Sequence, residues 1–157
     1  MCDKACEYFK RSFFTVDGLW FTMLEESSSF GKALEIDEKV WRVMPKIQSR
    51  RLRELYDIKG NTLQDLLAAL KIKFELEGYD ISVEEAGEDR VQIMVHGCPW
   101  FDIMKYAGRV DLAGRVGERI CNVEYQGWAD SFYKAIKFTL SSQLCKGEES
   151  CRLTFQK

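Results

Sequence analysis

The sequence predicts an α+β domain with an antiparallel four-stranded sheet of two hairpins, covered by helices and preceded by a helical N-terminal half. Two observations predict this class. Up to about residue 78, apolar residues recur every three to four positions, as on amphipathic helices. In residues 80–97 and 136–156 they instead tend to alternate with polar residues, as on strands with one buried face. We expect both hairpins to join one sheet within a single domain, residues 1–157.

The first predicted helix covers residues 4 to about 26. Its second half is apolar nearly all round, which is typical of a helix that is buried or shared with a partner, so residues 13–24 predict a homodimer interface. Gly18 lies inside this helix and predicts close packing there, because glycine otherwise weakens a helix. A second helix is expected from about residue 30 to 58, kinked at Pro45.

Turn and capping residues place the remaining elements. Asn61 or Thr62 is expected to cap a third helix, and Gly78 to end it. Pro99 suits the first turn of a short helix. The other expected elements are a hairpin over residues 81–96, a helix over about 111–134, a strand near 136–144 and a strand over 151–155.

Composition restricts the partners. The chain has 23 basic and 25 acidic residues, a net charge of −2, and its charges are mixed, which argues against binding nucleic acid through a basic patch. No apolar run approaches the roughly 20 residues that span a bilayer, so no membrane contact is expected. Residues 1–7 include acidic residues and no apolar core of a signal peptide. We therefore expect a soluble, cytoplasmic protein, whose six cysteines are thiols or metal ligands.

Four cysteines, Cys98, Cys121, Cys145 and Cys151, lie in the C-terminal half. Four thiolates suit zinc or an iron–sulfur cluster, so these residues are the predicted metal ligands. Their spacing contains no C-x-x-C pair, and only the fold could bring them together. The alternative is that they are small buried core residues.

His96 and Glu124 are the candidate catalytic residues. His96 is the single histidine, with an ordinary pKa near neutrality, and the alternative for it is a surface residue at a strand end. Glu124 lies one helical turn after Cys121, and its alternative is an exposed helix carboxylate.

Other side chains are candidates for contact with a ligand. Trp100 and Tyr125 could line an apolar pocket for a small molecule. Asp17 and Asp37 are each embedded in an apolar run, where a bare buried carboxylate is costly. These two residues must therefore be paired, cap a helix or face a cavity.

Residues 16–21 (VDGLWF), 33–41 (ALEIDEKVW) and 123–125 (VEY), together with the late cysteines, resemble the aminothiazoline carboxylate hydrolase-like family. That family is similar in fold to the four-vinyl-reductase-type ligand-binding domains. The resemblance implies a helix-covered antiparallel sheet with a pocket for a small organic ligand. The predicted function is therefore binding of a small ligand or a metal at a site with the late cysteines. The alternative is hydrolysis of a small cyclic C–N or C–S compound.

Overall fold

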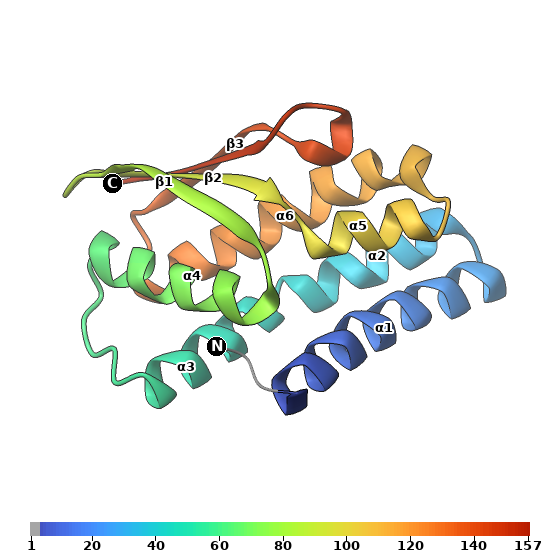
Figure 1. Ribbon diagram of the computed structural model, residues 1–157, viewed down its shortest axis with the longest axis horizontal. Coiled ribbons are helices and arrows are strands. Elements are labelled where there is room, and N and C mark those ends of the chain that lie inside the picture. The colour runs from blue at the N-terminus through green and yellow to red at the C-terminus, as the bar shows by residue number, and fades with distance from the viewer. Residues whose placement is uncertain (1–3) are drawn as a thin grey trace.

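The computed structural model describes residues 4–157, and Met1, Cys2 and Asp3, part of the segment expected not to be a signal peptide, lie outside this range. Its architecture confirms the predicted α+β class (Figure 1). The elements in chain order are α1 (Lys4–Ser27), α2 (Phe30–Trp41), α3 (Met44–Leu55), α4 (Leu63–Glu77), β1 (Asp80–Ala86), β2 (Arg90–Gly97), α5 (Pro99–Tyr106), α6 (Val110–Phe132), β3 (Lys137–Ser142), a 3-10 turn (Leu144–Lys146) and β4 (Cys151–Gln156).

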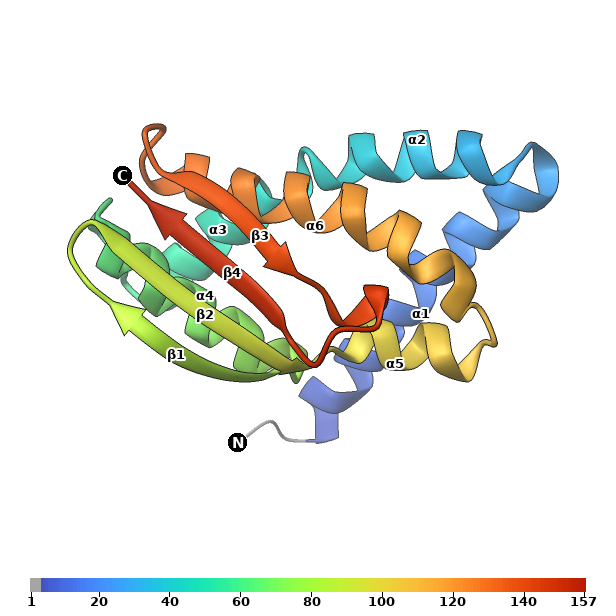
Figure 2. The same ribbon diagram turned by 90° about the horizontal axis from the view of Figure 1, so that it is seen from above.

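The four strands form one antiparallel sheet in the order β1-β2-β4-β3 (Figure 2). Both predicted hairpins therefore join the same sheet, because β2 of the first pairs with β4 of the second. The register places Val95 opposite Ile81 on one side and opposite Cys151 on the other. This pairing brings the end of β2 next to the start of β4, two places that the sequence separates by α5, α6 and β3.

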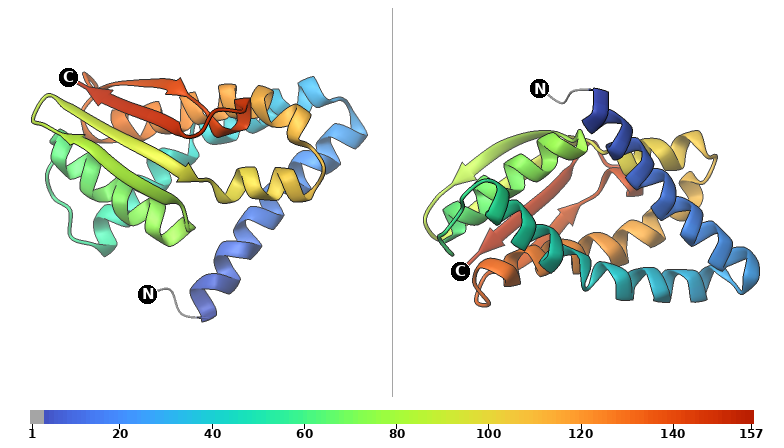
Figure 3. Two further views of the ribbon diagram at one scale, coloured as in Figure 1. Left: turned by 45° about the horizontal axis from the view of Figure 1, so that its top comes forward. Right: turned by 90° about the horizontal axis from the view of Figure 1, so that it is seen from below.

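The helices lie on one face of the sheet, with α4 and α6 directly against it and α1 on the far side (Figures 1 and 3). The core lies between the sheet and these two helices, and its largest fully buried side chains include Trp128, Phe74 and Phe155. Helix α4 has a capping box, in which the Thr62 hydroxyl and the Asp65 carboxylate each accept from the other's backbone N–H. Gly78 ends this helix in the left-handed conformation, with φ of 81°.

Helix α1 covers the other helices without entering the core. None of its residues is buried, and it packs mainly against α2, with which it forms a helical hairpin that crosses the molecule obliquely (Figure 3). The close packing predicted at Gly18 is wrong, because a Cβ atom added there would meet no atom within 4 Å. The apolar residues of α1 instead divide between the inner side and a solvent-facing side.

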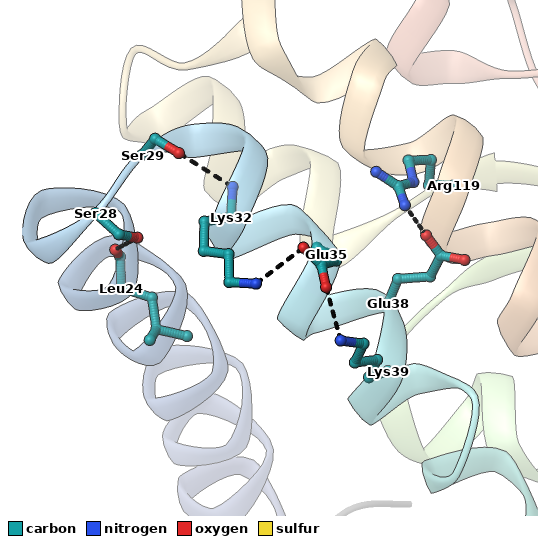
Figure 4. A network of polar contacts seen from close by, with 8 residues as sticks. All are labelled: Leu24, Ser28, Ser29, Lys32, Glu35, Glu38, Lys39 and Arg119. Atoms are coloured by element: carbon teal, nitrogen blue, oxygen red, sulfur yellow. Dashed lines mark hydrogen bonds and ion pairs between the residues drawn. The ribbon is translucent and has the colours of Figure 1, made fainter.

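The single kinked helix predicted for about residues 30–58 is wrong, since the structure has two helices, α2 and α3. Pro45 lies in the first turn of α3, where a missing backbone N–H breaks no helical hydrogen bond. The Ser29 hydroxyl caps the other end of α2 by accepting from the Lys32 N–H at 3.2 Å (Figure 4). Glu38 then ties α2 to α6 through an ion pair with Arg119 (Figure 4).

Among residues 4–157, no helix is both long enough and apolar enough to cross a membrane.

Candidate ligand-binding site

A pocket lies where the end of the sheet meets α1, α2, α5 and α6. The cavity volume that the centres of water-sized spheres can occupy is about 60 Å³. On this scale one water needs about 10–15 Å³, so several waters fit. The total volume between the lining atoms, including the part open to solvent, is about 740 Å³. The lining residues are Phe14, Asp17, Asp37, Trp41, Glu77, Tyr79, Val95, Cys98, Trp100, Val116, Gly117, Ile120, Cys121, Glu124, Tyr125, Leu140, Cys151 and Leu153.

Asp17 of α1 and Asp37 of α2 line the pocket from adjacent helices. Burial raises the pKa of Asp17. Burial, and then repulsion by Asp17, raise the pKa of Asp37 to about 7, although a hydrogen bond from Trp41 opposes this. Of the three settings expected for these carboxylates, the structure therefore shows the third, in which they face a cavity.

Glu124 lies in the same wall within a buried ion-pair network. Lys73 Nζ of α4 contacts Glu124 Oε1 at 2.9 Å and Glu77 Oε2 at 2.6 Å, and the Lys73 side chain is only 2% exposed. Burial alone would lower the pKa of Lys73, but the carboxylates of Glu124 and Glu77 outweigh it and raise that pKa. One ammonium group thus serves two carboxylates. The alternative of an exposed helix carboxylate is wrong for Glu124, which is 6% exposed.

The fold brings Cys98, Cys121 and Cys151 to this pocket. They come from the start of α5, from α6 and from β4. The fourth thiol, Cys145 Sγ, lies behind the wall, 2.6 Å from the position that a Cβ at Gly117 would take. All four are free thiols and partly buried. Burial raises the pKa of each, to about 11 for Cys98, so the thiols are protonated near neutral pH.

Residues 4–157 contain no group of three or more His, Cys, Asp or Glu side chains placed to hold a metal ion. The predicted ligands Cys98, Cys121, Cys145 and Cys151 are therefore not gathered into such a group in this arrangement. Their apolar surroundings suit neutral thiols better than thiolates. A bound metal therefore remains a prediction, and the site proposed below does not depend on it.

Trp100 and Tyr125, the predicted ligand-contacting residues, both line the pocket. Tyr125 is 4% exposed and packs between the rings of Phe74 and Phe138.

His96, in contrast, lies outside the pocket. It is exposed near the end of β2, and its Nε2 atom is 2.8 Å from the Ser82 hydroxyl of the neighbouring strand. The alternation of β2 explains this placement, because Val95 points toward the pocket and the next side chain points to the other face. The structure therefore separates the two catalytic candidates, His96 and Glu124.

Three residues of the site were not predicted from the sequence: Lys73, Glu77 and Tyr79. A lysine within LKIKF resembles the exposed side of an amphipathic helix. The available signal is the apolar context, since Lys73 lies between Leu70 and Phe74, which both face the core. That is the same argument that identified Asp17 and Asp37.

The fold and the pocket define an α+β domain that encloses a small cavity with apolar, acidic and thiol-bearing walls. The chain belongs to a family of unknown function, DUF6125, whose model matches residues 4–150. This match does not link it to the aminothiazoline carboxylate hydrolases or to the four-vinyl-reductase-type domains, so that resemblance remains a prediction. No curated protein shows significant sequence similarity to the chain.

Proposed function

We propose that this protein binds a small organic molecule in the pocket between its sheet and helices α1, α2, α5 and α6. One observation carries the proposal: unfilled space between the end of the sheet and the helices, lined by polar groups as well as rings. Protein interiors are otherwise packed to crystal-like density, and small-molecule sites are mostly apolar cavities with a few placed polar groups. The pocket has this composition.

The size of the pocket restricts how a ligand enters. A cavity of about 150 Å³ engineered into another protein accepts benzene. The cavity in this protein, about 60 Å³, is smaller than that. A ligand of that size therefore requires one wall to move. Helix α1 is the wall best suited to do so, because it contributes Phe14 and Asp17 to the pocket yet has no buried residue.

A thermal-shift screen of small molecules against the purified protein and two variants tests the proposal. Cys121→Phe fills the pocket from α6, and Asn122→Phe makes the same change at the exposed neighbouring position. A ligand at 100 times its dissociation constant stabilises the fold by about 2.7 kcal/mol. We expect hits to raise the melting temperature of the wild type and of Asn122→Phe, but not of Cys121→Phe.

A second filling variant, Leu140→Phe, enters the pocket from β3 and serves if Cys121→Phe does not fold. Hits that stabilise all folded variants equally bind elsewhere and contradict the proposal, as does a screen without hits.

We place binding ahead of the hydrolase alternative because His96 does not line the pocket and Glu124 is engaged by Lys73. Incubation with an aminothiazoline carboxylate, followed by mass spectrometry of the products, tests the alternative. Ring opening that Glu124→Gln abolishes and His96→Ala retains would favour hydrolysis at this pocket. The expectation that all six cysteines are thiols or metal ligands is wrong for Cys6, which forms a disulfide. The proposed setting for either function is still the cytoplasm, and the four free thiols of the C-terminal half support this proposal.

A further inference from the structure

We propose that the ligand is a small organic cation, a protonated amine or an amidinium with an apolar body. Its charged nitrogen would bind between Asp17 and Asp37, and its apolar body would lie against the rings of the pocket. This inference rests on the proposed ligand-binding function and deepens it by naming the chemical class of the ligand.

The charge of the walls favours a cation. Among the described residues, those that line the pocket include four carboxylates, Asp17, Asp37, Glu77 and Glu124, and no lysine, arginine or histidine. Lys73 lies behind this wall, where it already contacts Glu77 and Glu124. The network of one ammonium and two carboxylates cannot neutralise a further acid. An anionic ligand would therefore meet only negative charge.

Asp17 and Asp37 are the pocket carboxylates that have no cationic partner among residues 4–157. No cation among residues 4–157 contributes to the electrostatic surroundings of either group, and they repel each other across the helical hairpin of α1 and α2. Among residues 4–157, the group that acts on Asp37 as a hydrogen-bond donor is Trp41. Two neighbouring carboxylates of this kind must share a proton or bind a cation. An ammonium group is the species that satisfies both at once.

Tyr125 adds a hydroxyl-bearing side chain to the pocket wall. This side chain is 4% exposed and lines the pocket. A tyrosine hydroxyl can accept a hydrogen bond from an ammonium N–H as well as donate one. The adjacent Glu124 belongs to the same wall.

The aromatic lining fits the same chemistry. Phe14, Trp41, Tyr79 and Trp100 surround the space together with Tyr125. The faces of such rings carry negative electrostatic potential and attract cations, most strongly where water is excluded. Carboxylates and rings in one small pocket are therefore selective for an organic cation over a neutral molecule of equal shape.

Matched probes test this inference by isothermal titration calorimetry at pH 8, where ammonium groups are charged and Asp37 is ionised. Benzylammonium is compared with benzyl alcohol, in which a hydroxyl replaces the ammonium, and with benzoate. Isobutylammonium and isobutanol form a smaller pair for the same comparison. We expect each ammonium to bind at least tenfold more tightly than its alcohol, and benzoate not to bind.

Variants assign the preference to the two aspartates. Asp37→Asn and Asp17→Asn preserve the shape of each side chain and should reduce the ammonium preference to less than about threefold. Tyr125→Phe should weaken the binding of the probes by several-fold because it removes one polar contact. Glu35→Gln, on α2 but outside the pocket, with a side chain that is 43% exposed, should leave binding unchanged.

The outcomes separate this inference from the proposed function. Equal binding of ammonium and alcohol, tighter binding of benzoate, or an ammonium preference that both aspartate variants retain would overturn the cation assignment. Binding that Cys121→Phe blocks would still support the pocket as a ligand site in those cases. If no probe binds and the wider screen finds no ligand that Cys121→Phe excludes, both proposals fail.

Discussion

Lys73 provides a single positive charge for two carboxylates in the interior of the protein. Its ammonium group also lies 5.4 Å from the ring centroids of Phe74 and Tyr79, so it is enclosed by rings as well as by acids. We expect Lys73→Met to lower the free energy of unfolding by roughly 3–5 kcal/mol, because it leaves buried Glu124 without its cation. Urea titration at pH 7 measures this loss.

The controls for Lys73→Met are on the same network and the same helix. Addition of Glu124→Gln should restore part of the lost stability, since it removes the charge left unpaired. Lys71→Met, at an exposed position of α4, should change the free energy of unfolding by less than about 1 kcal/mol. An equally small effect of Lys73→Met would show that the ion pair is solvated.

Asp37 makes the unliganded protein sensitive to pH. Its pKa of about 7 in the folded state lies above the ordinary value of 3.8, so between these values the folded state keeps a proton that the unfolded state has lost. Stability from this group is therefore present at low pH and is lost as the pH rises toward 7 and beyond. Asp17 and Glu124, whose pKa values burial also raises, contribute with the same sign.

We expect the melting temperature of the wild type to fall between pH 5 and pH 8 by more than that of Asp37→Asn, which cannot ionise. Scanning calorimetry across this range measures the difference. Glu35→Gln is the matched control on α2, because ion pairs with Lys39 and Lys32 lower the pKa of Glu35 to about 2, below the range tested. Parallel curves for the wild type and Asp37→Asn would mean that Asp37 is ionised throughout.

How far single residues could be predicted depends on whether their partners are local. The apolar neighbours of Asp17 and Asp37 predicted that these carboxylates are paired, cap a helix or face a cavity, and the structure selects the cavity. The role of Lys73 could not be predicted, because its partner Glu124 lies on a helix that follows in sequence only after the first hairpin. His96 fits its alternative of a surface residue at a strand end, because successive side chains of a strand point to opposite faces and the preceding Val95 faces the pocket.

Helix α1 differs from every other long element in having no buried residue. Its amides are held by the helix and by the contact with α2 and not by a core, so local opening should require little free energy. We expect amide hydrogens of α1 to exchange faster than those of α4 and of the buried part of α6 in mass spectrometry-detected exchange. A ligand in the pocket should slow amide exchange in α1, since Phe14 and Asp17 of this helix line the pocket.

Two results would contradict this picture of α1. Protection of α1 equal to that of α4 in the free protein would mean that it is part of the cooperative core. Protection by ligand that appears in α3 and leaves α1 unchanged would place the ligand outside the pocket. The Cys121→Phe variant serves as the control, because added ligand should not slow exchange in it.

At the scale of elements, local signals predicted most boundaries. The Thr62 cap, the left-handed Gly78 and the change to alternation at residue 80 correspond to observed ends of α4 and β1. The break between α2 and α3 was not predicted, because Pro45 is compatible with a kink and with a new first turn. Only the turn before it, at Arg42 and Val43, distinguishes the two.

For the whole molecule, the sheet order and the position of the pocket could not be predicted from the sequence. Alternation indicated two hairpins, yet the β2–β4 pairing that joins them depends on long-range packing. The pocket likewise needs residues from both the helical hairpin of α1 and α2 and the C-terminal strands. The convergence of three cysteines on it follows from that topology and from no local spacing.

The solvent-facing side of α1 remains a predicted homodimer interface. Leu19, Trp20 and Met23 are more than half exposed there, a pattern typical of a surface that a partner covers. We expect a dimer at tens of micromolar in sedimentation velocity and a monomer for Trp20→Glu, which would bury a charge in the interface. Arg11→Glu, at an exposed polar position, should leave the dimer intact. A monomeric wild type would contradict the interface.

The central claim concerns the chemistry of the pocket, and a crystal structure of the protein with benzylammonium tests it most directly. We predict the nitrogen atom within about 2.7–3.2 Å of carboxylate oxygens of Asp17 and Asp37, with the ring against Trp41 or Trp100 and α1 displaced outward. A probe bound outside the pocket, or one inside it with its nitrogen away from both aspartates, would contradict the account.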